Sequence, residues 1–270
     1  MTDFKVQVAL TTPFDVDGHP HAGALQAHIA LLIEDSVDGL VVAGTTGEGP
    51  LLEENEIEAV VAAAVEAAAD RLEVVAHVGR PSTPASVRLA TAAAQAGADA
   101  LIAVTPYYFG LGDEQLLRHY EALLGAVDGM PVLAYAFPDR TGNDLSPEML
   151  DRLAGEGLAG LKDSTKSSQR HSEYLEVGRR HPELRVFVGS ESLTLQSLRG
   201  GGAGTISALA NARADVLLRL REDPSEEVQQ AVDTARGELP DIPRVKRAVS
   251  ERLADRGVRY SPAPRPPLGA

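Results

Sequence analysis

The chain of 270 residues contains no cysteine and no tryptophan, and aromatic residues make up only 4% of it. Without cysteine, the protein has no disulfide framework, no thiolate metal ligand and no cysteine nucleophile. Basic residues are also scarce, because 25 lysines and arginines stand against 39 acidic residues, for a formal net charge of −14. Nucleic acids and anionic membranes bind basic patches, so we expect neither as a partner.

Long hydrophobic runs are missing as well. The N-terminus lacks a basic segment followed by a long apolar run, so no signal peptide is predicted. The most apolar helical segment, residues 60–69, is rich in alanine, interrupted by Glu66 and too short to span a bilayer. We therefore expect a soluble, cytoplasmic protein. The seven histidines lack the spacing of metal ligands, so we expect no metal site, and we predict no cofactor.

Strand-like and helix-like segments alternate through most of the chain. Short apolar runs typical of buried parallel strands occur at residues 5–10, 39–43, 72–78, 100–104, 131–135, 158–161, 185–188 and 203–207. Helical patterns or helix-start signals follow the first seven of these runs. The pattern predicts an α/β fold, a (β/α)8 TIM barrel. An open doubly wound sheet is the alternative, but eight units in about 220 residues favour closure.

The alternation stops after residue 207. Helical patterns then follow one another at residues 216–221, 226–235 and 244–253, separated by proline-containing segments. The proline-rich tail, residues 261–268, cannot form a helix, and we expect it to lie extended on the surface. We therefore divide the chain into a catalytic barrel, residues 1–222, and a short C-terminal helical extension with its tail, residues 223–270.

Chemically useful residues follow the predicted strands repeatedly. They are Thr11-Thr12-Pro13, Gly44-Thr45-Thr46-Gly47-Glu48, Thr105-Pro106-Tyr107-Tyr108, Tyr135, Lys162 and Gly189-Ser190-Glu191. Because the active site of a (β/α)8 barrel lies at the C-terminal ends of its strands, we expect these groups to meet at one mouth.

Lys162 ends the predicted strand at residues 158–161. Desolvation at such a position disfavours the ammonium form and leaves a nucleophilic amine, as in lysines that form Schiff bases. The alternative is a lysine that reaches solvent. Similarly, Tyr135 could face the mouth or the core, and Arg140 could hold a carboxylate or remain solvated.

The turn at residues 44–47 could bind an anion with its backbone N–H groups, or be an ordinary loop between a strand and a helix. It is not a G-x-G-x-x-G fingerprint, so we predict no dinucleotide site. The glycine-rich residues 200–204 follow a helix and precede a strand, the reverse of a phosphate loop, so we interpret them as a helix stop.

The ordered set GTTGE, TPYY, Y-x-x-P-x-R-T-G, G-x-K-D and G-S-E resembles the dihydrodipicolinate synthase and N-acetylneuraminate lyase family. The resemblance covers about residues 5–210 and, more loosely, the C-terminal helices. Members of this family are class I pyruvate-dependent aldolases on a (β/α)8 barrel. The resemblance implies that Lys162 forms an imine with pyruvate and that Tyr135 moves protons. Thr45 and Tyr108 would complete a hydroxyl relay, with Tyr107 or Tyr108 reaching across a dimer interface.

The same resemblance implies four substrate-binding residues. Thr46 would bind the pyruvate carboxylate, and the backbone of Ile206 would line the pocket together with Gly189. Arg140 matches the arginine that holds the carboxylate of the second substrate in the synthase branch.

The sequence also departs from the family pattern. Ala136 replaces an asparagine and is followed by Phe137, Gly49 replaces a serine, and Asp163-Ser164 is more similar to the lyase and sugar-acid aldolase branches. We predict a synthase-like enzyme that condenses pyruvate with an aldehyde acid, and a homodimer or homotetramer. The alternatives are a 2-keto-3-deoxy sugar acid aldolase or an N-acetylneuraminate lyase-like retro-aldolase and, in another class, a non-catalytic barrel that binds keto acids.

Overall fold

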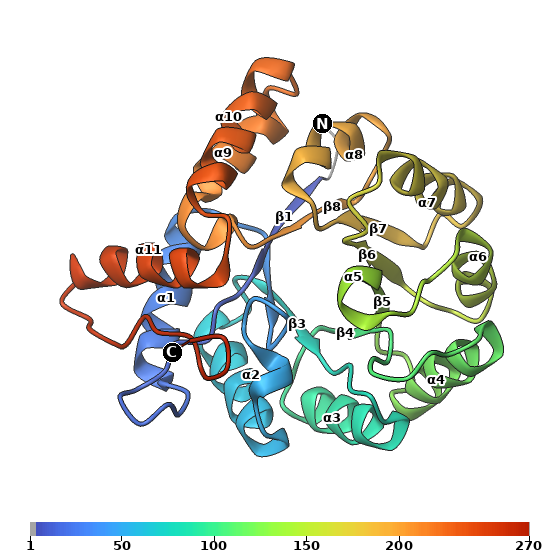
Figure 1. The fold of residues 1–270 in the computed structure, drawn as a ribbon, viewed down its shortest axis with the longest axis horizontal. Helices are drawn as coiled ribbons and strands as arrows, with labels where there is room; N and C mark the ends of the chain where they lie inside the picture. Colours follow the sequence, from blue (N-terminus) through green and yellow to red (C-terminus); the bar gives the residue numbers. More distant parts are fainter. Residues whose placement is uncertain (1–3, 270) are drawn as a thin grey trace.

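The computed structural model describes residues 4–269, and eight parallel strands close into a barrel within them. Each strand pairs with the next one in the chain, and the last pairs with the first, as Figure 1 shows. The strands are β1 (Lys5–Ala9), β2 (Gly39–Val42), β3 (Glu73–His77), β4 (Ala100–Val104), β5 (Val132–Ala136), β6 (Gly160–Asp163), β7 (Arg185–Val188) and β8 (Gly204–Ser207). The predicted TIM barrel is thus confirmed.

Helices surround the strands as the alternation predicts. They are α1 (Ala22–Glu34), α2 (Glu54–Ala68), α3 (Thr83–Gln95), α4 (Asp113–Ala126), α6 (Pro147–Gly155), α7 (Ser168–Arg180) and α8 (Thr194–Arg199). The sequence signals that begin them act as expected: the Ser146 hydroxyl caps α6 by accepting from the Met149 N–H. Two short elements were not predicted, namely η1 (Gly49–Leu51) and α5 (Pro138–Thr141), and a short turn, η2 (Glu191–Leu193), leads directly into α8.

The hydrophobic core has two layers. A large cluster fills the space between the strands and the helices, and a smaller one fills the interior of the barrel. Because side chains alternate along a strand, Tyr135 points to the interior while its neighbours Ala134 and Ala136 belong to the outer layer. The alternation thereby directs Tyr135 into the barrel.

The sixth strand differs from its predicted bounds. The predicted strand began at Leu158 and ended on Lys162, whereas β6 begins at Gly160, continues to Asp163 and pairs Lys162 with Tyr135 on β5. Leu158 instead closes the preceding helix, because its N–H donates to the carbonyl of Leu153. The shift places the lysine inside the paired barrel wall and beside the tyrosine.

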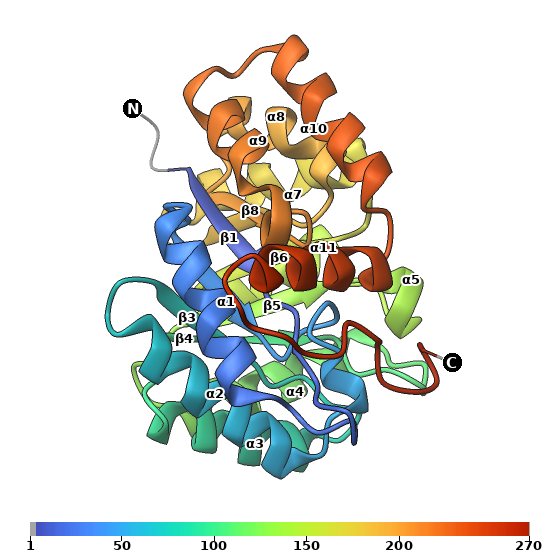
Figure 2. The same cartoon turned by 90° about the vertical axis from the view of Figure 1, so that its left-hand side faces the viewer.

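Three further helices complete the fold: α9 (Ala210–Glu222), α10 (Glu226–Glu238) and α11 (Ile242–Ala254). The first begins six residues before the predicted segment, and a kink at Arg213, which has non-helical backbone angles, interrupts it. α10 packs on α9, while α11 packs against α9 and α1. In Figure 2, the last residues run back alongside α11 in front of the barrel.

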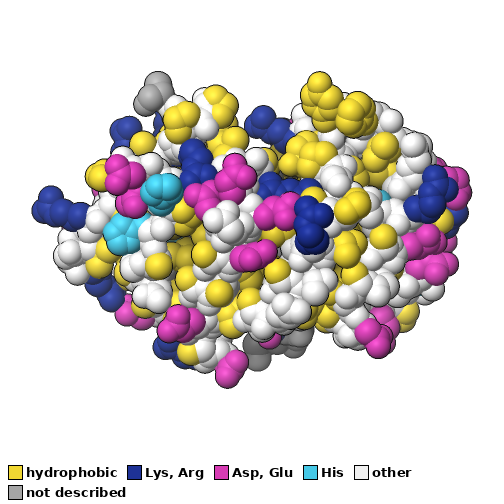
Figure 3. Space-filling model, turned by 90° about the horizontal axis from the view of Figure 1, so that it is seen from below, with side chains coloured by type: hydrophobic (Ala, Val, Ile, Leu, Met, Phe, Trp, Pro, Cys, Tyr) yellow, Lys and Arg dark blue, Asp and Glu magenta, His cyan; other side chains and the backbone are white. Residues whose placement is uncertain are grey.

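Charged groups are dispersed on the face drawn in Figure 3, where acidic and basic side chains lie among hydrophobic and uncharged ones. Despite the net charge of −14, that face carries no extended patch of one sign. Within residues 4–269, no helix has the length and apolar character needed to cross a membrane.

Candidate functional site

A cavity of about 770 Å³ opens at the C-terminal ends of the strands. Seven of the eight site residues predicted from the sequence line it: Thr45, Thr46, Tyr135, Arg140, Lys162, Gly189 and Ile206. These residues come from the ends of β2, β5, β6, β7 and β8 or the loops that follow, so closure of the barrel brings them together. Tyr108 does not line the cavity.

Lys162 is buried, with 6% of its surface exposed. Its Nζ lies 4.4 Å from the centroid of the Tyr135 ring. Among residues 4–269, no carboxylate lies within ion-pair distance of this Nζ. The lysine amine is therefore directed at the tyrosine and the cavity without an acidic partner to hold it.

Gly189 leaves the space that the lysine occupies. A β-carbon at this position would lie 2.3 Å from the Ser164 Oγ and 3.0 Å from the Lys162 Cε. The glycine N–H also donates to the carbonyl of Asp163 at 2.6 Å, which fixes the end of β7 against the end of β6. No residue with a side chain fits there unless Ser164 or Lys162 moves.

The Tyr135 ring is held by two other rings. Phe137 stacks on it at 5.7 Å between centroids, and His77 meets it edge-on at 6.2 Å. Burial lowers the pKa of His77 to about 3, helped by the charge of Lys162, so His77 packs as a neutral ring. The sequence analysis missed both rings as site residues. Their positions, at the end of β3 and just after β5, were the available signal.

The loop at residues 44–48, here called the threonine loop, is held by backbone hydrogen bonds and by the Thr12 hydroxyl. The Gly49 N–H donates to the Gly44 carbonyl at 2.9 Å, and the Thr12 hydroxyl donates to the Gly47 carbonyl at 2.7 Å. A β-carbon at Gly49 would lie only 1.8 Å from a backbone oxygen, so this turn requires glycine. The loop thereby presents two threonines to the cavity in a fixed conformation.

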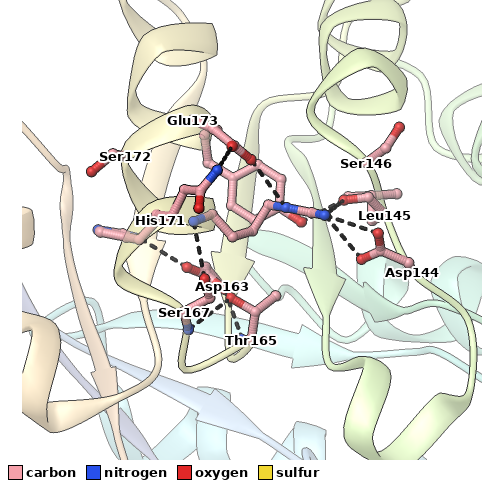
Figure 4. A network of polar contacts seen from close by, with 12 residues as sticks. Asp144, Leu145, Ser146, Asp163, Thr165, Ser167, His171, Ser172 and Glu173 are labelled. Carbon is pink, nitrogen blue, oxygen red and sulfur yellow. Dashed lines mark hydrogen bonds and ion pairs between the residues drawn. The ribbon is translucent and has the colours of Figure 1, made fainter.

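The residue after the lysine is fixed from the other side of β6, as Figure 4 shows. One oxygen of the buried Asp163 accepts from the backbone and hydroxyl of Thr165, and the other meets His171 Nδ1 at 2.9 Å. Because Asp163 is an acceptor here, His171 carries a proton on Nδ1. This network anchors the end of the strand that carries Lys162.

The C-terminal helices also contribute to the cavity, which the sequence analysis did not predict. Its lining includes Asp233 and Arg236 of α10 and the segment 240–243 that leads into α11. The Arg236 Nε lies 3.2 Å from the buried Glu191, whose other oxygen accepts from Ser207 of β8. These residues are 16 and 45 positions from Glu191, so no local pattern in the sequence links them.

Two further cations line the mouth of the cavity. The Arg140 guanidinium lies 6.0 Å from the centroid of the Phe137 ring, and Lys166 pairs with Asp139 at 2.9 Å. The lining also contains Glu191, Asp233 and Asp241, and both Lys166 and Arg236 are paired with carboxylates. Arg140 has no such partner among residues 4–269, so it is the cation available to an anionic substrate.

Tyr108 lies apart from these groups. It is 87% exposed, has a left-handed φ of +83°, and packs edge-on against the exposed Phe109 at 5.0 Å. The preceding Tyr107 packs against the interior cluster of the barrel instead. Within residues 4–269, no group of three or more acidic or histidine side chains could hold a metal ion.

A closed (β/α)8 barrel with a lysine, a tyrosine and threonines in a cavity at the carboxyl ends of its strands has the architecture of a small-molecule enzyme. Comparison with known proteins then specifies the family. A sequence model described as the dihydrodipicolinate synthetase family matches residues 4–270, and the chain belongs to this family.

Relatives and solved structures agree with this assignment. An uncharacterized DapA-like lyase of Halobacterium salinarum is 38% identical over 79% of this chain and 69% of its own length. A 4-hydroxy-tetrahydrodipicolinate synthase of Hydrogenobaculum is 38% identical over 75% of this chain and 69% of its own. Among crystal structures, YagE of E. coli K12 in complex with pyruvate has a TM-score of 0.89 at 28% identity, covering 98% of this chain and 92% of that one. Dihydrodipicolinate synthase of Aquifex aeolicus has a TM-score of 0.88 at 29% identity, with the same coverage. The protein is therefore a lyase of this family.

Proposed function

We propose that the protein is a class I aldolase or synthase that condenses pyruvate with an aldehyde acid through an imine on Lys162. The observation that carries the proposal is the buried lysine amine, which faces Tyr135 at 4.4 Å without a carboxylate partner. The nitrogen of a lysine side chain, once it has lost its proton, is a nucleophile for a keto carbon. The similarity to a family member crystallised with pyruvate supports the choice of keto acid.

The chemistry follows from the imine. The lysine nitrogen adds to the keto carbon and water leaves. The protonated imine then accepts electrons when a proton leaves the methyl carbon, and the resulting enamine attacks the aldehyde. Tyr135 is the proposed general acid and base, because its ring is locked beside the lysine by Phe137 and His77. Thr45 is the proposed link in the proton relay.

The cavity lining suggests where each substrate binds. Thr46 and the backbone of the threonine loop would hold the pyruvate carboxylate, with Ile206 and Gly189 as the walls around the keto carbon. Arg140, at the mouth, would hold the carboxylate of the aldehyde acid. The order of the cavity, from lysine to arginine, thus matches a small keto acid followed by a longer acidic acceptor.

A retro-aldolase acting on a 2-keto-3-deoxy sugar acid or on N-acetylneuraminate is the second candidate. It is favoured by Asp163-Ser164 after the lysine and by the hydroxyl groups of Ser190 and Ser192 along the cavity, which could hold a polyhydroxy chain. A barrel that only binds keto acids is the third. The three differ in product: a condensation product, a cleavage product, or none.

We propose a role for Tyr108 only in a homo-oligomer. Its exposure beside Phe109, outside the cavity of its own chain, fits a role across a subunit interface in a homodimer or homotetramer. In that arrangement, the tyrosine of one copy would complete the hydroxyl relay of another.

The experiment is to trap the imine. Borohydride added with pyruvate should increase the intact mass by one reduced pyruvyl group, and peptide mapping should place it on Lys162. Lys166, also on the cavity, is the matched control site. An unmodified protein, or a label on Lys166, would contradict the mechanism. A screen of aldehyde acceptors read by product mass then decides between condensation, cleavage and binding alone.

A further inference from the structure

The segment Ser261–Gly269, here called the C-terminal strap, crosses from α11 to the threonine loop. Ser261 forms an antiparallel bridge with Phe14, in the loop that follows β1, and Leu268 lines the cavity. Figure 2 shows this last stretch of the ribbon passing below α11. The strap therefore joins the end of the described chain to the mouth of the barrel.

Lys246 of α11 is fully buried beneath this strap. Its Nζ donates to Glu48 Oε1 at 2.6 Å and to the carbonyl of Ala263 at 3.3 Å, and it lies 4.1 Å from the centroid of the Phe14 ring. Burial lowers the pKa of Lys246, which the neighbouring Glu48 counteracts. A charge withdrawn from water in this way is tolerated only because the carboxylate, the carbonyl and the ring face it together.

Arg265 holds the same carboxylate from the strap. Its backbone N–H donates to Glu48 Oε2 at 2.7 Å, so both oxygens of Glu48 are held by residues of the C-terminal extension. The Arg265 guanidinium anchors the strap: it forms two hydrogen bonds of 2.6 Å to Glu56, and others to the carbonyls of Leu51 and Gly18. This arginine therefore ties the strap to α2 on one side of the threonine loop and to the first loop on the other.

Glu48 is the last residue of the threonine loop, two positions after Thr46. It has a left-handed φ of +59°, and it lies between Gly47 and Gly49, where an added β-carbon would collide with backbone oxygens. A loop packed this tightly transmits a displacement of Glu48 to the threonines instead of absorbing it.

We propose that Arg265 is a positioning residue for the keto-acid site. Its guanidinium anchors the strap, the strap's backbone and Lys246 hold Glu48, and Glu48 fixes the threonine loop with Thr46, the proposed pyruvate ligand. This inference rests on the proposed function, because it assumes that the threonine loop binds the keto acid. The competing explanation is that the strap only stabilises the fold, in which case its loss lowers the melting temperature and leaves pyruvate affinity unchanged.

The test compares pyruvate affinity, measured by calorimetry, with the melting temperature, Tm, in Arg265→Ala, Arg265→Lys and a control. The control is Arg252→Ala, which removes the bonds from one guanidinium nitrogen to both oxygens of Asp35, just after α1, and a bond to the carbonyl of Asn211. It touches nothing in the threonine loop. Both alanine variants lose an arginine–carboxylate ion pair and at least one bond to a backbone carbonyl, so both should lower Tm. Lysine retains the charge of Arg265 but cannot form the forked contact with Glu56.

Arg265→Ala should raise the dissociation constant for pyruvate about tenfold, which corresponds to about 1.4 kcal/mol, the size of one lost hydrogen bond to the carboxylate. Arg265→Lys should give an intermediate value, and Arg252→Ala the wild-type value. All affinities are compared at a temperature at which every variant is folded. The proposal would be overturned if Arg265→Ala bound pyruvate as tightly as wild type, or if Arg252→Ala weakened pyruvate binding as much as Arg265→Ala does.

Borohydride trapping is measured separately. Wild type that binds pyruvate but traps none would refute the imine and leave the affinity comparison intact, whereas wild type that does not bind pyruvate would refute both.

Discussion

Gly189 is the position where the smallest substitution should have a large effect on the proposed chemistry. In Gly189→Ala, the new β-carbon would start 2.3 Å from the Ser164 Oγ and 3.0 Å from the Lys162 Cε. Both distances are shorter than the ~3.5–4.0 Å of ordinary contacts between nonbonded carbon atoms. The lysine side chain or the end of β7 must therefore move, by an amount on the order of 1 Å.

Gly189→Ala should affect the free energy of unfolding and the rate of imine formation by different amounts. Overpacking a filled site costs about 1–3 kcal/mol of unfolding free energy. A 1 Å displacement of a reacting group can reduce the rate ~10²-fold. We therefore expect Gly189→Ala to be folded at room temperature and to trap pyruvate with borohydride about 10²-fold more slowly than wild type.

Gly125→Ala is the matched control for this experiment. Gly125 lies on the exposed side of α4, and nothing lies within 4 Å of its added β-carbon. This substitution should stabilise the protein by about 0.4–1 kcal/mol and leave trapping unchanged. If Gly189→Ala traps pyruvate at the wild-type rate and melts at the wild-type temperature, then Gly189 does not define the space around the lysine, and the site geometry is misinterpreted.

Three further outcomes can be measured. Tyr135→Phe should retain pyruvate binding by calorimetry and lose about 10²–10⁴-fold in kcat, since it removes only the hydroxyl; near wild-type turnover would make the tyrosine a packing residue. Arg140→Ala should remove a charged hydrogen bond worth about 1.5–3 kcal/mol, so KM for a carboxylated acceptor should rise while KM for pyruvate stays the same. An unchanged KM for the acceptor would show that Arg140 does not bind it. Hydrogen bonds from Arg265 lower the pKa of Glu56 from its ordinary value of 4.5 to about 2. A carboxyl with a depressed folded pKa stabilises the fold above its unfolded pKa, so this contribution should fall as the pH drops from 4.5 towards 2, and Glu56→Gln should flatten the dependence of denaturant stability on pH in that window.

The sequence predicts this fold well because its signals are local. Apolar runs, helix caps and first-turn prolines lie next to the elements that they define, as Ser146 does at the start of α6. The error at β6 has the same origin: Leu158 belongs to the apolar run, but its N–H is used by the preceding helix. A pattern of side chains does not reveal whether the backbone of a residue between two elements bonds to the helix or to the strand.

The residues of the candidate site likewise fall into those that the sequence predicts and those that only the structure reveals. Residues that follow strands, such as Tyr135 and Thr46, were predicted to meet because the topology of a barrel brings strand ends together. Arg236 and Leu268 were not, because they reach the cavity through the packing of helices and tail after the barrel pattern has stopped. Their chemistry is ordinary, and only the tertiary structure distinguishes them from solvated surface residues.

The contacts of Glu48 also bear on the order of folding. Its partners Lys246 and Arg265 lie 198 and 217 residues further along the chain, and the anchor from Arg265 to Gly18 spans 247. Contacts of such high sequence separation require closure of the longest loops, and they form late when local structure is already present. Until they form, the Glu48 carboxylate retains its water, since an unpaired buried charge costs several kcal/mol. Closure of the barrel is equally non-local, because Lys5 on β1 pairs with Gly204 on β8. A refolding chain would thus acquire an ordered threonine loop only when its final segment docks.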